Sequence, residues 1–409
     1  MAMICPECDW LNSDYETEAS TDLHCQRCGH TLYRCARHRA SRLQALTYSA
    51  LLMLAAALSF PFLGFATQGT PHYMTLTDTV TTLVSHHFMA LGIMIGVLLL
   101  VLPFLYLGLV AYLTFAIQYQ RTLPGMRMAA RTLASIAPWL MLDVFLVGIL
   151  VALVKLHSIA KLELGLSFWA YCAATLLIAR IWSLMDMPWL WDQLLGPVAA
   201  PHNTHAGTAR QQSLCSCECC SAIQLMQTTH CQRCGHPVHS RRPHHLSITI
   251  ALLLAASIMY IPANVFPIMD TTFLGQTQSS TIVGGIIQLW RGGSYPIAII
   301  ILVASILVPL AKIFVLAWLC WQHHSQYALT AQQKQRFYQV TEFVGRWSMI
   351  DIFVVAVLTA LVQQGNIMNV IPGPAILSFA AVVVLTMLAA MAFDPRQLWD
   401  ALPQQETHP

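Results

Sequence analysis

The heptapeptide His24-Cys25-Gln26-Arg27-Cys28-Gly29-His30 occurs a second time, letter for letter, as residues 230–236. The offset of 206 residues is about half of the 409-residue chain, and a long hydrophobic stretch follows each copy. Because an internal repeat determines architecture before any local pattern does, we interpret the chain as one unit used twice. Each unit is predicted to contain a small cysteine-rich domain followed by a bundle of membrane helices.

The composition is typical of a polytopic membrane protein. Charged residues make up 10% of the chain, against roughly 25% in ordinary globular domains. Hydrophobic residues reach 56% and are gathered into long runs. The beginning of the chain carries Cys, Asp, Glu and Arg instead of the basic start and apolar core of a secretory signal. We therefore expect the N-terminus to stay on the side of the membrane where it is made.

Eight hydrophobic segments are long enough to cross a bilayer, which requires about 20 residues each. The expected spans are 43–66, 88–118, 133–156, 165–187, 246–269, 296–321, 340–363 and 374–393. We predict an all-α polytopic membrane protein with two repeats of four transmembrane helices, each preceded by a small zinc-ribbon domain. The expected boundaries are 1–40 for ribbon 1, 41–195 for module 1, 196–210 for a linker, 211–242 for ribbon 2 and 243–402 for module 2.

The third span of each half carries the same signature. Trp139-Leu140-Met141-Leu142-Asp143 matches Trp347-Ser348-Met349-Ile350-Asp351 at an offset of 208 residues. Four helices per half return the chain to its starting side of the membrane. The two repeats are therefore predicted to be parallel, related by an axis along the membrane normal.

The distribution of Lys and Arg predicts the orientation. Basic residues precede the first and fifth spans and lie between the second and third and between the sixth and seventh. The loops 67–87 and 364–374 contain neither Lys nor Arg. Since basic loops stay in the cytoplasm, we expect both termini and both cysteine-rich domains to be cytoplasmic. This rule also accounts for the Arg clusters near the ribbons, so no nucleic-acid partner is expected.

Paired Cys-x2-Cys elements predict two metal sites. The expected ligands are Cys5, Cys8, Cys25 and Cys28 in the first ribbon, and Cys217, Cys220, Cys231 and Cys234 in the second. Four thiolates in this pattern form the closed tetrahedral site typical of structural Zn²⁺, and such short segments need the metal in order to fold. Zinc is favoured, and a rubredoxin-like iron site stays open because its ligand spacing is similar. Cys215 and Cys219 are spare thiols beside the second site.

Lys312 is the most informative residue within the predicted spans. A Lys at bilayer depth costs about 2.5–3.5 kcal/mol on insertion scales, so it is expected to face a cavity or a partner. Ser305 lies two helical turns earlier on the same face, and Pro309 interrupts the backbone hydrogen bonds between them. The first half has Leu99 and Tyr106 at the aligned positions, which favours a functional role for this polar stripe. The alternative is a Lys that extends to the cytoplasmic headgroups.

Four further polar residues lie in the predicted spans. Asp143 and Asp351 either begin their helices, favoured by the helix dipole, or belong to a charged pair in which Lys312 is a partner for Asp351. Thr386 interrupts the eighth span, and its alternative role is a hydrogen bond to its own helix. Lys155 ends the third span on the external side, where it either extends to the headgroups or lines a transport path.

The sequence resembles the paraquat-inducible protein A family, and the LetA-type members are most similar in layout. The specific elements are Cys217-Glu218-Cys219-Cys220-Ser221-Ala222-Ile223, the run 345–349 and the stripe from Ser305 to Lys312. The resemblance implies a protein of the bacterial inner membrane that works with a periplasmic partner containing mammalian-cell-entry (MCE) domains. That partner forms a hydrophobic tunnel towards the outer membrane.

The implied role is to pass phospholipid between the bilayer and that tunnel, for lipid homeostasis of the outer membrane. Ser305, Lys312 and Thr386 would then bind a lipid headgroup, with Asp351 balancing the charge. The sequence has no phosphate-binding loop of the Gly-x4-Gly-Lys-[Ser/Thr] type and no catalytic constellation, so no enzymatic activity is expected. Two alternatives are a membrane redox protein with iron-thiolate sites and a stress-sensing scaffold.

Overall fold

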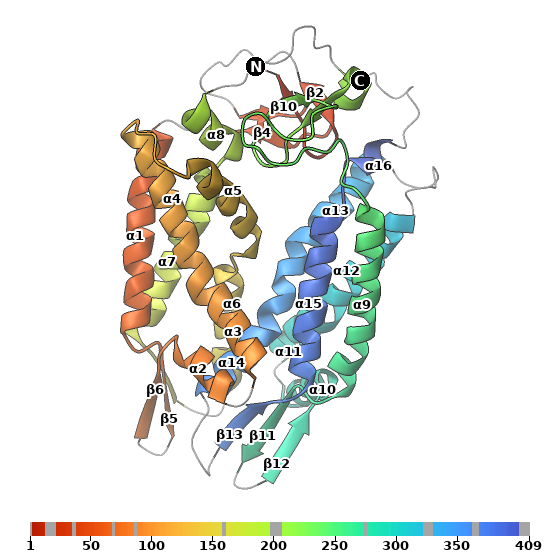
Figure 1. Ribbon diagram of the computed structural model, residues 1–409. Helices are drawn as coiled ribbons and strands as arrows, with labels where there is room; N and C mark the ends of the chain where they lie inside the picture. The colour runs from red at the N-terminus through yellow and green to blue at the C-terminus, as the bar shows by residue number, and fades with distance from the viewer. Residues whose placement is uncertain are drawn as a thin grey trace.

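The computed structural model describes most of the chain. The described residues are 2–12, 22–34, 38–67, 70–85, 88–157, 161–196, 207–273, 276–293, 295–321, 330–361 and 368–400. Two helical modules stand side by side, with the two cysteine-rich domains at one end and two small β-sheets at the other (Figure 1). The predicted architecture of two four-span modules, each preceded by a four-cysteine domain, is confirmed.

Eight helices or helix pairs are long and apolar enough to cross a membrane. Module 1 consists of α1 (Arg39–Ser59), α2 (Asp78–Ser85), α3 (Met89–Gly96), η1 (Val97–Val101), α4 (Leu102–Gln118), α5 (Met126–Ile136), η2 (Ala137–Trp139), α6 (Leu142–His157), α7 (Leu166–Leu184) and α8 (Met187–Leu195). Module 2 consists of α9 (His245–Val265), α10 (Ile282–Arg291), α11 (Tyr295–Ile301), η4 (Leu302–Leu307), α12 (Val308–Trp321), α13 (Ala331–Gly345), η5 (Arg346–Met349), α14 (Ile350–Leu361), α15 (Ala375–Ala392) and α16 (Gln397–Asp400).

The second span of each module contains a π-helical segment, η1 or η4, at matching positions. Each segment ends just before a proline, Pro103 or Pro309. A proline within a helix has no N–H group and its ring clashes with the carbonyl four residues earlier, which is Leu99 or Ser305. The wider turn relieves that clash, and π-bulges of this kind are frequent at functional sites.

The third and seventh spans begin earlier than the sequence predicts. The expected ranges 133–156 and 340–363 omit most of α5 and the first part of α13. These two helices are less apolar, and α5 carries Arg127 and Arg131. In both modules a short 3-10 turn, η2 or η5, separates this polar helix from the apolar one that follows it.

The two modules meet through their third spans, α6 and α14. Phe145 and Phe353, which occupy equivalent positions, make an edge-to-face contact with ring centroids 5.3 Å apart. Gly148 permits the close approach, since a Cβ atom there would lie 3.1 Å from the Cβ of Phe353. This self-complementary contact places a pseudo-twofold axis between the modules and agrees with parallel repeats.

Each module carries a three-stranded antiparallel sheet at the end opposite the ribbons (Figure 1). The strands are β5 (Leu63–Thr67), β6 (Thr70–Met74) and β7 (Lys161–Leu164), and β11 (Met269–Phe273), β12 (Gln276–Ser280) and β13 (Met368–Pro372). The sequence analysis did not predict these strands. The predicted spans 43–66 and 246–269 were wrong at their C-terminal ends, because α1 ends at Ser59 before β5 and α9 ends at Val265 before β11. In both sheets the central strand, β5 or β11, directly follows the first helix of its module.

The cysteine-rich domains are built on short strands. They are β1 (Met3–Ile4), β2 (Trp10–Asn12), β3 (Leu23–His24) and β4 (Thr31–Tyr33) in ribbon 1, and β9 (Leu214–Ser216) and β10 (Ile223–Leu225) in ribbon 2. Strand β8 (Gly207–Thr208) lies in the range expected as a linker and pairs with β2 of ribbon 1. The segment that leads into ribbon 2 thus adds a third strand to the β1–β2 sheet of ribbon 1.

Each ribbon contacts both modules. Arg34 of ribbon 1 and Glu218 of ribbon 2 bind their own modules, through Asp186 and Arg396. Towards the opposite half, Arg27 lies over the ring of Trp399 on α16, with Cζ 4.6 Å from the ring centroid, and the equivalent Arg233 forms an ion pair of 2.7 Å with Asp192 on α8. The repeated heptapeptide thus supplies an arginine that reaches the other half from each ribbon.

Candidate metal centres and intramembrane cavity

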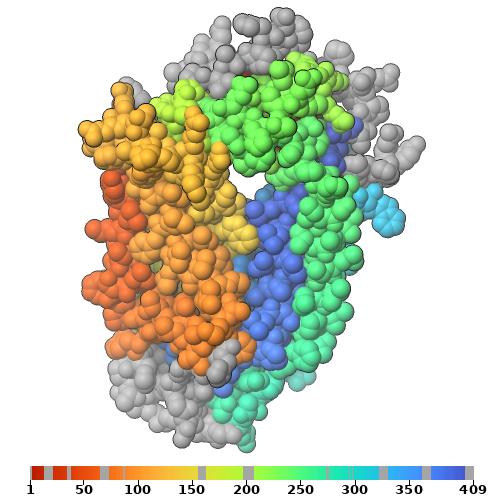
Figure 2. All heavy atoms as spheres, in the orientation of Figure 1, coloured from red at the N-terminus to blue at the C-terminus, as the bar shows by residue number. Residues whose placement is uncertain are grey.

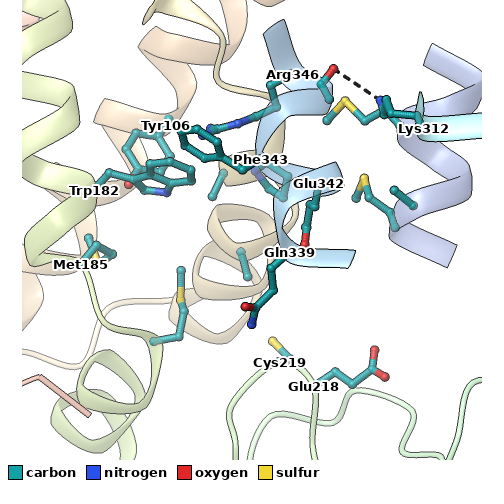
Figure 3. A pocket seen from close by; sticks show the side chains of 18 residues that line it. Tyr106, Trp182, Met185, Glu218, Cys219, Lys312, Gln339, Glu342, Phe343 and Arg346 are labelled. Atoms are coloured by element: carbon teal, nitrogen blue, oxygen red, sulfur yellow. Dashed lines mark hydrogen bonds between the residues drawn. The ribbon is translucent and has the colours of Figure 1, made fainter. Parts of the chain in front are cut away.

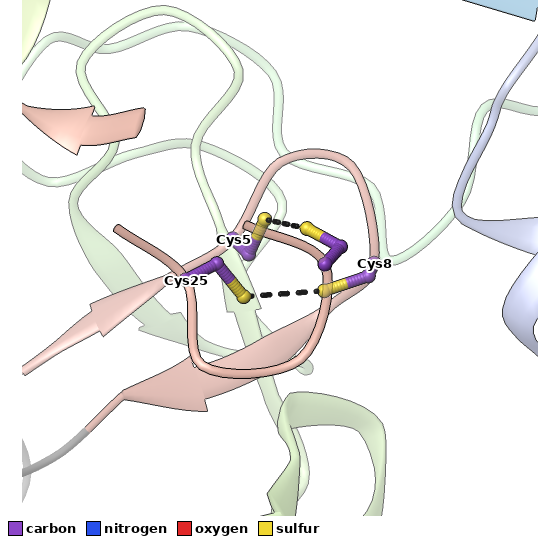
Figure 4. A group of neighbouring side chains, drawn as sticks. Cys5, Cys8 and Cys25 are labelled. Atoms are coloured by element: carbon purple, nitrogen blue, oxygen red, sulfur yellow. Dashed lines mark hydrogen bonds between the residues drawn. The ribbon is translucent and has the colours of Figure 1, made fainter. Parts of the chain in front are cut away.

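The cysteines of ribbon 1 form a compact tetrahedral group. The Sγ atoms of Cys5, Cys8, Cys25 and Cys28 all lie within 4.8 Å of one another. The Sγ atoms are 3.5 Å apart in the pairs Cys5–Cys28 and Cys8–Cys25 (Figure 4). A zinc ion with four Zn–S bonds of about 2.3 Å requires sulfur atoms about 3.8 Å apart, so these four thiols fit such an ion.

Ribbon 2 repeats this geometry with Cys217, Cys220, Cys231 and Cys234, whose Sγ atoms also lie within 4.8 Å of one another. The Cys217–Cys234 and Cys220–Cys231 distances are again 3.5 Å. The side chain of Gln224 and the backbone of His236 donate to sulfur atoms of this group. Such donors stabilise thiolates, which is the form that binds a metal.

Neither spare thiol of ribbon 2 belongs to its metal group. The Sγ atom of Cys215 points to the carbonyl oxygen of Gln224 at 3.6 Å, and burial raises the pKa of this thiol. Cys219 lines a cavity between the ribbon and the membrane helices. The rings of His30 and His236 lie outside both groups, which consist of cysteines alone among the described residues. Both sites are therefore closed four-thiolate sites, a coordination typical of structural metals.

A cavity of about 560 Å³ separates the two modules directly beneath ribbon 2. Figure 2 shows this hollow between the helices of the two halves. Its lining residues come from both modules and from ribbon 2, and they are Tyr106, Ala134, Ala137, Pro138, Trp182, Met185, Met187, Glu218, Cys219, Lys312, Gln339, Glu342, Phe343, Gly345, Arg346, Met387, Ala390 and Met391. Most of this wall is apolar, with a few polar groups, which is typical of a ligand-binding cavity.

Lys312 borders the cavity from α12 and is 2% exposed. Its Nζ atom donates to the carbonyl oxygen of Gly345 at 3.4 Å (Figure 3). It also donates to Oγ1 of Thr386 at 3.2 Å. The absence of a side chain at residue 345 is required here, because a Cβ atom would lie 2.6 Å from Nζ. The ammonium group is thus held inside the protein, next to the cavity and away from the outer rim.

The structure brings some of the predicted site residues together and separates others. Thr386 contacts Lys312 and also donates to the carbonyl of Val383 on its own helix. Ser305 is fully buried, and its hydroxyl has no hydrogen-bond partner in the described part of the chain. Asp351 lines a different, smaller cavity of about 40 Å³ beside α10.

The remaining two predicted residues lie on α6. Asp143 is exposed in its first turn, unlike the buried Asp351 that occupies the equivalent position of module 2. Lys155 lies near the end of the helix, and its side chain is outside the described part of the structure. Of the predicted polar residues, Lys312 is therefore the one that lines the larger cavity in the described part of the chain. Thr386 supports it by a hydrogen bond.

Three functional candidates were missed by the sequence analysis. Tyr106 is fully buried, lines the cavity and lies at the position equivalent to Lys312. Arg346 stacks on Trp182 across the module boundary, with Cζ 5.0 Å from the ring centroid. Glu342 lines the same cavity as Lys312, one turn of helix before Arg346. The offset of 206 residues identified Tyr106 as the counterpart of Lys312 but not as a functional residue, whereas the other two face the cavity only because the modules pack as they do.

The fold and the two closed thiolate groups define a multi-pass membrane protein built from a duplicated ribbon-and-bundle unit. Residues 40–195 and 246–403 match the model of the family described as Paraquat-inducible protein A. The chain belongs to this PqiA family, which confirms the resemblance noted from the sequence.

Three relatives cover nearly the whole chain. It is 37% identical over 405 residues to "Intermembrane transport protein PqiA" of Escherichia coli (strain K12), covering 99% of this chain and 97% of the relative. It is 29% identical over 402 residues to "Probable intermembrane transport protein" of Haemophilus influenzae, covering 97% and 95%. It is 29% identical over 398 residues to "Lipophilic envelope-spanning tunnel protein A" of Escherichia coli (strain K12), covering 97% and 91%. No solved structure matches the chain.

Proposed function

We propose that this protein is an inner-membrane lipid transport component that exchanges phospholipid between the bilayer and a periplasmic tunnel protein with MCE domains. Transport, without enzymatic activity, agrees with the names of two relatives, an intermembrane transport protein and a probable intermembrane transport protein. The observation that carries the proposal is the cavity between the modules, with the buried ammonium of Lys312 at its wall. A buried cation at membrane depth is costly unless a partner or ligand compensates it.

In this proposal a phosphate group is the ligand that compensates Lys312. Lys binds phosphate as a compact point charge, and Thr386 and the Gly345 carbonyl hold the ammonium in place. Ser305, Asp351, Asp143 and Lys155 line no described part of the larger cavity. For Ser305, the proposed role is to supply its buried hydroxyl in a second conformation of α12. Asp351, Asp143 and Lys155 are proposed to be charged positions along a transport path.

The proposed orientation has both ribbons and both termini in the cytoplasm. It is supported by the basic residues at the ribbon end of the helices, such as Arg39, Arg131 and Arg242, because cytoplasmic loops carry the excess of Lys and Arg. The cavity then opens towards the cytoplasmic leaflet, and the two sheets face the periplasm, where the MCE partner would bind.

We further propose that both thiolate groups hold Zn²⁺ in a structural role. The ion would be bound by the four cysteines of each ribbon and would supply the folding free energy that these small domains lack. A purified protein that is colourless and contains zinc would support this assignment. A coloured protein with iron would instead support the redox alternative, because zinc has no redox chemistry.

The experiment that tests transport uses a pair of glycine variants. Gly345→Ala introduces a methyl group that displaces Lys312, whereas Gly108→Ala places one where no atom lies within 4 Å. Both variants are expressed, with Lys312→Met, in a bacterium whose own relatives are deleted and whose outer-membrane barrier is defective. We expect Gly345→Ala and Lys312→Met to lower the barrier-restoring activity by at least about tenfold, equivalent to about 1.4 kcal/mol.

Gly108→Ala should restore the barrier as the unmodified protein does. Membrane insertion and metal content are measured for each variant, so that loss of the protein is not mistaken for loss of transport. Full restoration by well-inserted Lys312→Met would contradict the proposal. A requirement for the ribbons alone, with both cavity variants active, would favour the scaffold alternative.

A further inference from the structure

The charged groups of the cavity are arranged along its length. Lys312 and Arg346 lie at the end that is deeper in the helices, and Glu218 lies at the end next to ribbon 2 (Figure 3). Glu342 lies between them on α13, with its side chain exposed. Glu218 is paired with Arg242 and Arg396, so Glu342 is the acidic group that we consider on the ribbon side of Lys312 and Arg346.

Tyr106 adds a polar group from the other module. Its ring lines the cavity, its side chain is 0% exposed, and its hydroxyl has no hydrogen-bond partner in the described part of the chain. A buried hydroxyl without a partner is unfavourable, typically by about 1–3 kcal/mol. A ligand in the cavity that accepts a hydrogen bond would remove this cost.

Resting on the proposed transport function, we infer that the cavity selects phospholipids whose headgroup carries an ammonium group. Lys312 and Tyr106 bind the phosphate, one from each module, and Glu342 binds the headgroup ammonium. A phospholipid with an uncharged or anionic substituent beyond its phosphate would leave Glu342 without its counter-charge. Tyr106 and Glu342 are the specificity-determining residues in this assignment.

The order of the charges fits a lipid of the ribbon-side leaflet. From water inward, such a lipid presents its ammonium, then its phosphate, then its acyl chains. The cavity presents Glu342 nearer the ribbon and Lys312 and Arg346 deeper, with apolar walls that include Phe343 and Met387. A lipid therefore enters from that leaflet without turning over, and opposite charges meet along its headgroup.

The experiment is a lipid competition on the full-length protein. The purified protein is reconstituted in nanodiscs with equal amounts of phosphatidylethanolamine and phosphatidylglycerol, and the lipids that stay bound after transfer into detergent are quantified by mass spectrometry. The unmodified protein is expected to retain phosphatidylethanolamine over phosphatidylglycerol by about fivefold, the upper value for a solvent-exposed ion pair. Glu342→Gln should reduce this ratio to about one. Equal retention of the two lipids by the unmodified protein would overturn the inference.

Two matched controls keep the result specific. Glu163→Gln removes an acidic side chain on β7, at the opposite end of the molecule, and should leave the ratio unchanged. Tyr106→Phe should lower retention of both lipids about threefold without changing their ratio. Tyr171→Phe removes a buried hydroxyl that bonds to Leu142 outside the cavity and should change neither quantity.

The outcomes separate this inference from the transport proposal. If Lys312→Met loses bound lipid while Glu342→Gln keeps the original ratio, selection by the ammonium group is wrong and lipid carriage stands. If Lys312→Met retains lipid as the unmodified protein does, both are wrong. Metal content and a single elution peak establish that each variant is folded.

Discussion

The two halves of the protein share a scaffold and differ at the cavity. Asp186 accepts from the backbone amide of Arg34 at 3.2 Å, and the equivalent Asp394 accepts from the amide of Arg242 at the same distance. At the cavity, however, Tyr106 stands where module 2 has Lys312. Contacts that hold the fold are thus duplicated, and contacts with the cavity are not.

A second difference accompanies the first. Lys312 lies across Gly345, and the residue of module 1 that corresponds to Gly345 is Ala137, on the Tyr106 side of the same cavity. Module 2 therefore contains both Lys312 and the space at Gly345 that its side chain occupies. The two modules therefore contribute different residues to one cavity, which neither module forms alone.

Loss of a metal ligand should have the largest effect, and the same effect in both halves. Cys220→Ser removes one of four ligands, and structural zinc supplies about 10–16 kcal/mol of folding free energy in small domains. We expect metal content, measured by elemental analysis, to fall by about one ion per chain. Cys8→Ser should do the same in ribbon 1.

Cys219→Ser is the matched control, since this neighbouring thiol lies outside the metal group. It should keep the full metal content. Equal metal loss in Cys219→Ser and Cys220→Ser would mean that the ligand set of ribbon 2 differs from that of ribbon 1. The two metal sites would then not be equivalent.

A methyl group at the turn before the fourth span should have an intermediate effect. Gly165 and Gly373 are equivalent, and a Cβ atom would lie 2.7 Å from the carbonyl carbon of Pro61 in one case and 2.9 Å from that of Pro267 in the other. Gly165→Ala and Gly373→Ala should each lower the free energy of unfolding by about 1–3 kcal/mol, the usual cost of overpacking. Thermal unfolding in detergent measures this.

The two glycine variants test whether the equivalent turns of the two modules contribute equally to the free energy of unfolding. Similar losses of stability are expected, and Gly108→Ala should show none because its methyl group meets no atom within 4 Å. A large loss in only one half would contradict an equal scaffold.

The smallest effect concerns Asp186 and Asp394, which follow the fourth span of each module. Burial raises the pKa of Asp186 above its ordinary value, and the Arg34 amide and Arg39 guanidinium oppose this only in part. Burial also acts on Asp394, but the hydrogen bonds and charge of Arg396 hold its pKa below the ordinary value. Asp394 therefore contributes stability above its unfolded-state pKa that is lost as the pH falls, and Asp186 contributes stability at low pH that is lost as the pH rises.

Substitution by Asn should show these opposite slopes. We consider the range from about pH 2 to pH 7. The cost of Asp394→Asn should be constant above about pH 4 and fall as the pH drops below it, because the pKa of Asp394 is lowered. The cost of Asp186→Asn should be constant below about pH 4 and decrease as the pH rises above it, because the pKa of Asp186 is raised. Each change is on the order of 1 kcal/mol. Thermal unfolding of both variants and of the unmodified protein across this range measures the slopes. Slopes of the same sign would show that the two aspartates are electrostatically equivalent after all.

Much of the architecture could be predicted because it depends on local patterns. Long apolar runs identify the spans, and the repeated His24–His30 heptapeptide identifies both ribbons and their ligands. The strands opposite the ribbons could not be predicted, since β5 pairs with β7 about 100 residues away in the chain. Short strands that pair over such distances have no signal comparable to a 20-residue apolar run.

The cavity was predictable only in part. Lys312 is identified by its cost within a hydrophobic run, and its partner Thr386 by its polarity in another. Glu342 lies in a helix that is polar on several faces, so no periodicity distinguishes the face that meets the cavity. Tyr106 has the hydropathy of an ordinary aromatic residue of a membrane helix, and only the packing of the modules reveals its unpaired hydroxyl.

The position of the ribbons bears on how the two halves are held together. Arg27 and Arg233 each reach the opposite half, while Arg34 and Glu218 bind each ribbon to its own module. Each ribbon therefore bridges the two modules at one end of the molecule. Separating the modules at that end would require breaking contacts of both ribbons at once.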